Sequence, residues 1–303
     1  MYLLAIFHQC WFTWADNVSR GTISMKTPIK IKDHFLSKES FVVSGYKPGV
    51  LKTEPNLNSK ELQKYYNSDK YLSHSKSNSF FGKIYSKAST LMLSSKYKMV
   101  EKHINHKSNI VDFGCGKGDF VLKLLNKGYN CFGVENNELA ISKLKKQNIK
   151  HYRSIEELTK KIDFIMFWHS LEHVSNYESV LYSLKSLTSK NAKVLIALPN
   201  YLSFDARYYG SVWAAFDVPR HRFHFSPNGL KSVMADFGFK LVNTHPLYLD
   251  AFYISMISEK YKNNKLYFLF GMFIGLISNV MGLFNSNYSS SAFVFKKSNL
   301  ESF

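Results

Sequence analysis

The sequence predicts an α/β fold in which helices cover both faces of a doubly wound, mostly parallel β-sheet. Two observations carry this prediction. From residue 109 onward, nearly continuous apolar runs alternate with segments of helical periodicity, and a glycine-rich turn follows the first run. Such runs are typical of strands that are buried on both faces of a parallel sheet. With 303 residues, of which 45% are hydrophobic, the chain is long enough for one large domain with additions or for two small ones.

Five strands are expected before residue 200. They are predicted at residues 110–113, 130–134, 150–153, 163–168 and 193–198. Between them, apolar residues recur at helical spacing. The segments with this spacing lie at 119–127, 137–147 and 177–187, with a helical turn at 155–161. A basic helix at 87–107 is expected to precede the first strand.

The two ends of the chain are expected to differ from this alternation. After Pro199, the pattern predicts a helix at 227–237 and strands at 240–245 and 291–297. Residues 26–70 contain prolines and few periodic runs, so we expect an irregular N-terminal extension over 26–86. No basic region precedes the apolar run near the N-terminus, which argues against a signal peptide. Because Met25 followed by Lys-Thr-Pro-Ile-Lys is typical of a natural start, residues 1–25 are interpreted as a misassigned start or a disordered segment.

The cysteine spacing indicates the cellular compartment of the protein, and the net charge indicates which partners its surface can attract. Cys10, Cys115 and Cys131 have no paired spacing, which favours a reducing, cytoplasmic compartment over a disulfide framework. The net charge of +18 comes mostly from lysines spread along the chain. A basic surface attracts nucleic acid, anionic lipid or acidic small molecules. A nucleic-acid partner is the weaker alternative here, because no arginine-rich block is present.

Residues 266–284 carry no charge and are flanked by lysines. By length this segment qualifies as a membrane span. Its three glycines, with Ser278 and Asn279, favour a helix that is buried or covers a site. Peripheral contact with the inner membrane surface is the alternative interpretation.

The glycine-rich turn is the most specific local signal. Residues 110–118 read Ile-Val-Asp-Phe-Gly-Cys-Gly-Lys-Gly, with glycines at 114, 116 and 118. Glycine allows a sharp turn and a close approach to a ligand because it has no Cβ. The dinucleotide fingerprint G-x-G-x-x-G would need a glycine at position 119, which is Asp119. The turn therefore has a different spacing, with an acid, Asp112, two residues upstream.

This turn resembles motif I of the class I S-adenosylmethionine (SAM)-dependent methyltransferases. Two later stretches resemble bacterial methyltransferases of the type 11/12/23 group: Trp-His-Ser-Leu-Glu-His-Val at 168–174 and Pro-Arg-His-Arg-Phe-His-Phe-Ser at 219–226. The resemblance covers about residues 60–297. It implies a Rossmann-like sheet of seven strands with an antiparallel last strand. The methyltransferase domain would span 87–303, with a helical insertion at 250–288.

The resemblance implies SAM as the cofactor. Asp112 is expected to anchor the loop and the amino end of the cofactor, and the N–H groups of Gly114 to Gly116 to approach its methionine part. Glu135 would accept hydrogen bonds from the ribose hydroxyls. The expected cofactor-binding residues are Asp112, Gly114, Cys115, Gly116, Gly118, Glu135, Ser154, Ile155, Trp168 and His169.

Three histidines are candidate catalytic residues. His221 and His224 lie where relatives build the acceptor pocket, and His169 ends the fourth strand. Imidazole titrates nearest neutral pH, so it can deprotonate a hydroxyl. Asp217 is a candidate to orient one of these rings. The alternative is that the histidines and Arg220 brace the loop.

No metal is predicted. The stretch His169-Ser-Leu-Glu172-His173 matches a zinc-protease signature, but that signature needs a long helix and here it follows a strand. Quinone-pathway O-methyltransferases resemble this stretch and can hold a divalent metal with an acidic pair and a histidine, but His169 replaces one acid. Many relatives carry a zinc ribbon in the extension, whereas residues 26–86 contain no cysteine.

The predicted function is methyl transfer to a small-molecule or lipid- or glycan-linked acceptor. Oxygen is favoured over nitrogen, because methyltransferases that act on the amino groups of bases carry an [N/D]-P-P-[Y/F] stretch where this chain has Trp168-His-Ser-Leu. Two alternatives remain at this point. One alternative is a methyltransferase that modifies RNA through its basic surface, and the other is a module that binds SAM without catalysis.

Overall fold

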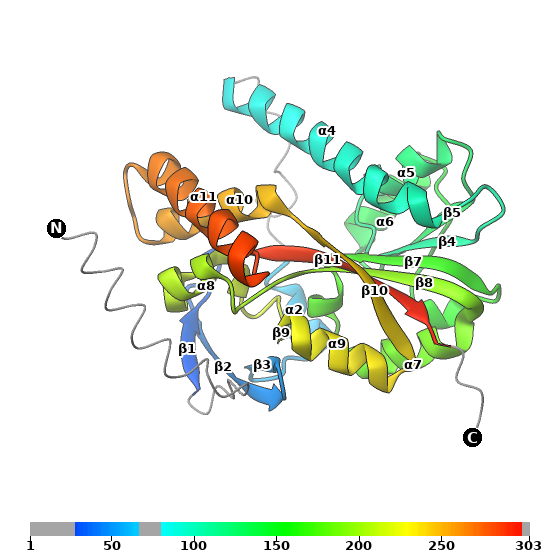
Figure 1. Cartoon of the computed structure of the whole chain (residues 1–303), viewed down its shortest axis with the longest axis horizontal. Helices are drawn as coiled ribbons and strands as arrows, with labels where there is room; N and C mark the ends of the chain where they lie inside the picture. Colours follow the sequence, from blue (N-terminus) through cyan, green and yellow to red (C-terminus); the bar gives the residue numbers. More distant parts are fainter. Residues whose placement is uncertain (1–27, 67–79, 299–303) are drawn as a thin grey trace.

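The computed structural model describes residues 28–66 and 80–298 and contains two β-sheets (Figure 1). The larger sheet has the strand order β10-β11-β8-β7-β4-β5-β6. Its strands are β4 (Ile110–Phe113), β5 (Cys131–Val134), β6 (His151–Tyr152), β7 (Ile162–Trp168), β8 (Thr188–Pro199), β10 (Phe239–Pro246) and β11 (Ser290–Lys297). β11 runs antiparallel to β10 and β8, and the other neighbouring pairs are parallel. The predicted fold class and its antiparallel last strand are confirmed.

Helices pack on both faces of this sheet (Figure 1). One face carries α4 (Phe80–Val100), α5 (Asp119–Leu125) and α6 (Glu138–Lys146), and the other carries α7 (Tyr177–Leu187) and α9 (Pro227–Asp236). Alternate residues of β7 divide between the two layers. Phe164 and Met166 belong to the cluster that contains α5, whereas Ile165 and Phe167 belong to the cluster that contains α7. This double burial is the reason that the strand is apolar throughout.

The expectation of an irregular extension is wrong. Residues 29–54 form an antiparallel meander of β1 (Ile29–Lys32), β2 (Ser40–Lys47) and β3 (Val50–Glu54). Phe41 and Val43 are buried on one face of β2, whereas Val42 points outward, which is the period of a half-exposed strand. The fourth strand of this sheet is β9 (Phe223–Phe225), which pairs with β3 from far along the chain. The sequence pattern did not reveal that pairing.

A separate cluster of buried side chains joins the small sheet to the C-terminal helices. Those helices are α8 (Phe204–Tyr209), α10 (Tyr248–Tyr261) and α11 (Tyr267–Asn285), with the short turn η5 (Ala214–Phe216) between them. Ile31 and Phe41 of the small sheet share this cluster with Ile254 of α10 and Ile274 of α11. The extension is therefore packed as part of the larger fold, and the predicted helical insertion at 250–288 is an antiparallel pair of helices.

Most predicted boundaries differ from the observed ones by a few residues. The basic helix, α4, begins and ends earlier than predicted, and β8 is longer at both ends. The segment from Asn200 to Ser226, for which the sequence predicted no element, holds α8, η5 and β9. Residues 1–25, interpreted as a misassigned start or a disordered segment, lie outside the described residues.

Candidate functional site

The glycine turn follows β4 at the carboxyl edge of the large sheet. Gly114, Gly116 and Gly118 all have positive φ, at 70°, 55° and 83°. A Cβ on Gly114 would lie 2.5 Å from the Cβ of Ser170, and one on Gly118 would lie 2.5 Å from a methyl group of Leu144. A Cβ on Gly116 would meet nothing within 4 Å. The middle glycine therefore borders open space, whereas the outer two allow close packing.

The sequence predicts that the N–H groups of Gly114, Cys115 and Gly116 face the cofactor, but each has an acceptor within the protein. Gly114 and Cys115 donate to the carbonyl of Val134, at 2.8 and 3.3 Å, and Gly116 donates to Oε2 of Glu135 at 2.8 Å. Oε1 of Glu135 accepts from the N–H groups of Asn136 and Asn137, at 2.9 Å each. Glu135 thus ties the turn to the end of β5, and its remaining lone pairs are what it can offer to a ligand.

Asp112 is an acidic side chain beside this turn with an unsatisfied buried oxygen. Its side chain is buried, and within the described part of the chain Oδ1 has no hydrogen bond. Burial raises the pKa of Asp112 to about 7, although Lys96 opposes this. A buried carboxyl group without a partner is costly, so it indicates a position for a cationic ligand group.

Lys96 is a candidate binding residue that the sequence analysis missed. It projects from α4 so that Nζ lies 4.6 Å from the ring centroid of Trp168, at the end of β7. Burial lowers the pKa of Lys96, while Asp112 acts to raise it. Nε1 of Trp168 is buried and has no hydrogen-bond partner among the described residues. A cation, a carboxyl group and an indole N–H therefore come together beside the turn.

Of the other residues expected to bind the cofactor, some can reach a ligand and others are packed in the interior. Ser154 is half-buried before the short turn η2 (Ile155–Glu157), but the Ile155 side chain is buried in the core cluster of α7. Only the backbone of Ile155 can therefore reach a ligand. A Cβ on Gly133 would lie 2.4 Å from the Cys115 sulfur, and burial raises the pKa of that thiol. Cys115 is a neutral packing residue.

His169 follows β7 with a positive φ of 51°, and carboxylates face both of its ring nitrogens. Nε2 lies 3.2 Å from Oδ2 of Asp250 on α10, and Nδ1 lies 3.6 Å from Oε1 of Glu172. Burial lowers the pKa of His169, but the two carboxylates outweigh burial and raise it to about 9. A ring that is protonated at neutral pH has no lone pair to accept a proton. This geometry argues against the predicted role as a base and indicates that His169 joins α10 to the sheet.

A small cavity lies between the large sheet and the small sheet. Its lining combines Glu172 and two imidazoles with aromatic and apolar side chains: Leu198, Pro199, Tyr201, Trp213, Ala215, His221, Phe223, His224 and Phe225. Nδ1 of His221 lies 2.9 Å from the carbonyl of Ala215, so the proton is on Nδ1 and Nε2 is the acceptor. The structure thus brings together both histidines that the sequence singled out.

His224 is poorly suited to act as a base. Thr53 Oγ1 donates to the carbonyl of His221 at 2.7 Å, so it accepts from Nε2 of His224 at 3.0 Å. Burial, together with His221, lowers the pKa of His224 well below its usual value. Thr53 lies on β3, so the extension positions this ring.

The prediction that Asp217 orients an imidazole is wrong. Its carboxylate accepts from Nε of Arg220 at 3.0 Å and from Nη2 at 2.6 Å. The same guanidinium donates to Oδ1 of Asp33, before the second strand of the extension, at 2.9 Å. Arg220 is 1% exposed and braces the loop, as the alternative interpretation held.

Glu172, His173 and His221 place ligand-type atoms within 4.8 Å of one another. Both oxygens of Glu172 are buried without a hydrogen bond to the described residues. Its negative charge nevertheless has a counterion, because the imidazolium of His169 lies 3.6 Å away. A metal ion here would be repelled by that imidazolium. The group fits a metal poorly, and the absence of a metal stays a prediction.

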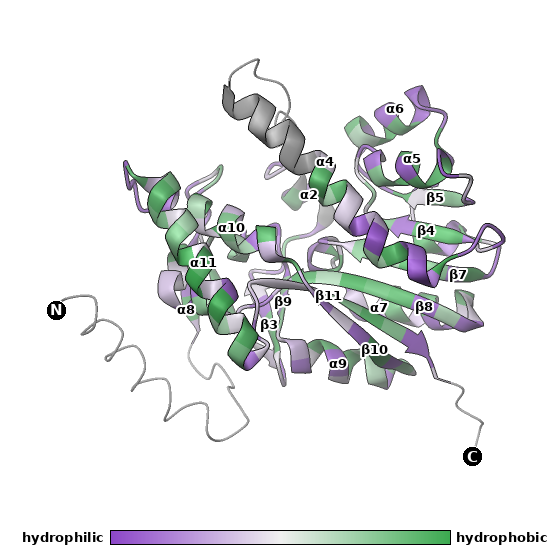
Figure 2. Ribbon diagram, turned by 45° about the horizontal axis from the view of Figure 1, so that its top comes forward, coloured by the Kyte–Doolittle hydropathy of each residue, from purple (hydrophilic) through white to green (hydrophobic). Residues whose placement is uncertain are grey.

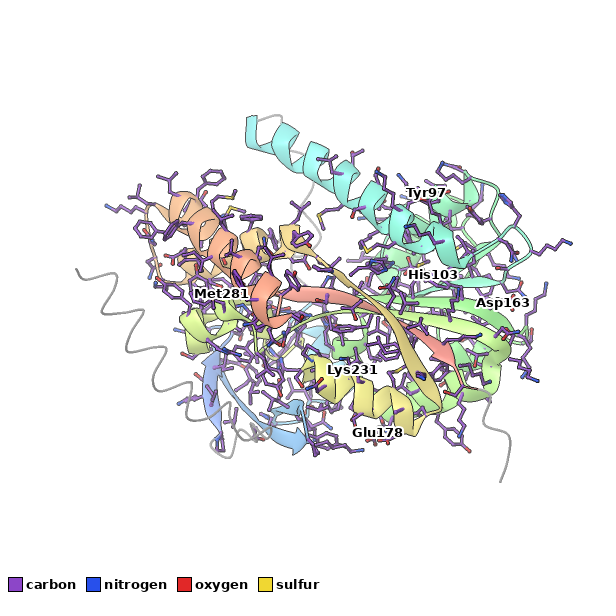
Figure 3. All side chains as sticks on the ribbon, in the orientation of Figure 1. Tyr97, His103, Asp163, Glu178, Lys231 and Met281 are labelled. Atoms are coloured by element: carbon purple, nitrogen blue, oxygen red, sulfur yellow. The ribbon has the colours of Figure 1, made fainter. Side chains whose placement is uncertain are left out.

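This site lies at one end of the large sheet. Figure 3 places Asp163 at the other end, remote from α10 and α11. Asp163 accepts from the N–H of Asn109 at 2.9 Å and from Oγ of Ser189 at 2.8 Å, which is a structural role. Ligands of open α/β sheets bind at the carboxyl ends of the strands, where the glycine turn, Asp112 and His169 lie.

A family model described as a methyltransferase domain matches residues 86–244, just over half of the chain. The chain belongs to this methyltransferase family. A search of curated protein sequences finds no match. This chain is similar in fold to magnesium protoporphyrin IX methyltransferase from Synechocystis PCC 6803, whose structure contains bound S-adenosylhomocysteine (SAH). That comparison gives a TM-score of 0.54 at 13% identity and covers 80% of this chain and 100% of the other.

The same Synechocystis enzyme with bound SAM gives a TM-score of 0.50 at 13% identity, covering 80% of this chain and 98% of the other. At this identity the likeness shows the fold alone. The positions of the predicted site residues stay a prediction. The additions that surround this site are the small sheet and the pair α10–α11.

Proposed function

We propose that this methyltransferase transfers a methyl group from SAM to an oxygen atom of a small-molecule or lipid- or glycan-linked acceptor in the cytoplasm. The observation that carries the proposal is the buried, unpartnered carboxyl group of Asp112 beside the open middle glycine of the turn. A polar group of this kind implies a ligand with a cationic group. The amino end of SAM carries such a group.

The surrounding residues fit the rest of the cofactor. Asp112 would hold the ammonium group of the methionine part and Lys96 its carboxylate, since Lys96 lies over the ring of Trp168 and near enough to Asp112 for the two charges to interact. Gly116 leaves room for the chain that joins the methionine part to the ribose. When bound, SAM supplies an electrophilic methyl group on its sulfonium. The protein supplies alignment, which is worth an effective molarity of about 10⁵–10⁸ M.

The small cavity between the two sheets has room for about one water molecule, so we infer that it marks where the hydroxyl group of the acceptor would be received. Its aromatic walls favour a flat or apolar group, and Nε2 of His221, the ring nitrogen that is not bonded to Ala215, would take the proton of an acceptor hydroxyl. Glu172 stabilises the imidazolium that results, because it lies in the same lining. This arrangement supports methylation at oxygen, where a proton must be removed.

Calorimetry with SAH tests the cofactor site. The variant Asp112→Ala removes the anionic partner of the ammonium group, so we expect about 10–100-fold weaker binding than in wild type. Asp236→Ala removes an exposed acid on the opposite face of the sheet and is the matched control, with unchanged affinity. Equal affinity in Asp112→Ala would contradict the assignment, and no binding by wild type would overturn the proposal. Transfer of labelled methyl groups from SAM to a cell extract then separates an enzyme from a binding module.

A further inference from the structure

Helix α11 is hydrophobic along most of its length (Figure 2), and many of its apolar side chains are exposed. The exposed side chains are Leu266, Phe268, Leu269, Phe270, Met272, Phe273, Leu276, Val280, Leu283 and Phe284. Leu269, Leu283 and Phe284 are 63%, 66% and 82% exposed. Soluble monomers seldom leave a continuous apolar face of this extent in water, so it indicates a binding surface.

The opposite face of α11 is built to pack against protein. Its buried residues are Gly271, Ile274, Gly275, Ser278 and Gly282, which recur at helical spacing. A Cβ on Gly271 would lie 2.5 Å from Cα of Met256, and one on Gly275 would lie 2.8 Å from Cα of Phe252. The glycines therefore let α10 and α11 approach closely. The helix has one face for the protein and one face with no partner among the described residues.

The charges around the apolar face have one sign. Lys260, Lys262 and Lys265 are exposed at the turn between the two helices. From residue 251 to residue 285 the one acid is Glu259, which is 1% exposed and pairs with Lys262 at 3.4 Å, so Lys260 and Lys265 are the lysines left to meet a charged surface. Lysines beside an apolar helix match the surface of an anionic bilayer, where each contributes about 1 kcal/mol.

Length and composition would also allow α11 to cross a membrane, and 28% of its most apolar window is buried. The connections of the helix argue against crossing. Its first turn follows α10 directly, and its last leads into β11 within the large sheet. In addition, Ser278 donates to the buried carboxylate of Asp205 at 2.6 Å. A crossing helix would have to leave α10 and abandon this hydrogen bond.

We propose that the exposed face of α11 docks in the plane of an anionic lipid surface, with the lysines at its N-terminal end contacting the headgroups. Apolar side chains of such a helix enter the boundary between headgroups and acyl chains, while its other face stays on the protein. The partner is thus a lipid bilayer. The helix stays packed in the folded protein while its exposed face contacts the bilayer.

Docking on a lipid surface also indicates the class of acceptor, and this part of the inference rests on the proposed function. Asp205 accepts from Nε1 of Trp213 at 2.8 Å, and Trp213 lines the acceptor cavity. Through Asp250, α10 pairs with His169 at the end of β7. The helices that meet the lipid are therefore joined to both sides of the site. The substrate class is an amphiphilic acceptor with a lipid tail held in the bilayer and a hydroxyl group that reaches the cavity.

Co-sedimentation with vesicles tests the docking. Wild-type protein should pellet with vesicles of phosphatidylcholine and phosphatidylglycerol, and less with phosphatidylcholine alone. Leu269→Glu combined with Phe273→Glu should weaken pelleting by about tenfold or more, because two side chains lose their transfer to an apolar phase. Leu139→Glu, on α6, replaces an apolar side chain of similar exposure and should pellet as wild type does. An alkaline carbonate wash should release the docked protein.

Other outcomes overturn the proposal. Wild type that stays in solution with both vesicle types would refute lipid docking. If the Leu269→Glu, Phe273→Glu variant pelleted as much as wild type does, the exposed face of α11 would not be the docking surface. Resistance to the carbonate wash would show that α11 spans the bilayer, and a dimer that the variant abolishes, without vesicle binding, would show that the face binds a second copy. SAH affinity of the variant checks its fold and reports on the cofactor site separately from docking.

Discussion

At the scale of single residues, the cofactor site depends on a carboxyl group in an unfavourable place. Asp112 is buried at the end of β4 and has no hydrogen bond at Oδ1 among the described residues. The glycine turn beside it has satisfied its own N–H groups through Val134 and Glu135. The turn thus contributes shape and open space, while Asp112, Lys96 and Trp168 contribute polarity.

The raised pKa of Asp112 predicts a pH-dependent affinity. Burial holds its pKa at about 7, so below that pH the empty site keeps the proton. A bound ammonium group needs the carboxylate, so binding expels the proton. SAH affinity should therefore rise about tenfold per pH unit up to about pH 7 and then level off. Calorimetry across this range measures it.

Asp112→Asn is the control for this titration, because it keeps the shape and removes the ionisable group. Its SAH affinity should be weak and independent of pH over the same range. The same burial makes the folded protein lose stability as pH rises from about 4 to 7, because the unfolded chain ionises first. A wild-type profile as flat as that of Asp112→Asn would show that Asp112 does not contact the amino end.

At the scale of secondary-structure elements, the pair α10–α11 connects the surface to the site. Its close approach depends on Gly271 and Gly275, whose missing Cβ atoms leave room for the backbone of α10. Ser258 of α10 accepts from the N–H of Ala214 at 2.8 Å, which fixes the pair against the cavity wall. Small residues here allow tight contact, whereas large apolar residues on the other face remain for the lipid.

The substitution Gly271→Ala tests this packing. In an exposed helix, glycine to alanine stabilises by about 1 kcal/mol. Here the new methyl group would lie 2.5 Å from Cα of Met256, and a backbone atom cannot move aside cheaply. We expect a net loss of about 1–2 kcal/mol in the free energy of unfolding, measured by urea denaturation. Met272→Ala, on the exposed face, should change it by less than about 0.5 kcal/mol. Stabilisation by Gly271→Ala would disprove the close packing.

At the scale of the whole molecule, the extension and the methyltransferase domain form one folded unit. β3 pairs with β9, and Thr53 of β3 holds His224. The guanidinium of Arg220 bridges Asp33 and Asp217 in the interior between them. Although burial opposes it, Arg220 keeps the pKa of both carboxyl groups below their usual value. The acceptor cavity therefore exists only where both parts are folded together.

Arg220→Met should destabilise the whole molecule. The substitution fills the space but leaves two acids without their cation, and we expect a loss of about 3 kcal/mol or more. Arg153→Met is the matched control, because Arg153 pairs with Glu138 on the surface, where solvent screens the charges, so its loss should change the free energy of unfolding far less. Thermal and urea unfolding measure both. If both variants lost a similar amount of free energy of unfolding, the buried bridge would stabilise the protein no more than a surface ion pair does.

The sequence by itself determined the alternation of strands and helices, the glycine turn and the acid before it. Those features are local, since apolar periodicity and positive φ depend on neighbouring residues. The family resemblance added the reversed last strand and the histidines of the acceptor region. Even so, local reasoning left the N–H groups of the turn free, because their acceptors lie on β5.

The tertiary structure alone decided which distant groups meet. It brought Lys96 of α4 beside Trp168, paired His169 with Asp250, and turned the expected partner of an imidazole, Asp217, toward Arg220. The first two contacts join residues that lie more than 70 positions apart, so no spacing in the sequence encodes them; Asp217 and Arg220 are three positions apart, but their pairing inside the protein depends on Asp33 and on the burial of the guanidinium. The charge state of a buried group follows from its surroundings in space, and for that reason the roles of these residues required the fold.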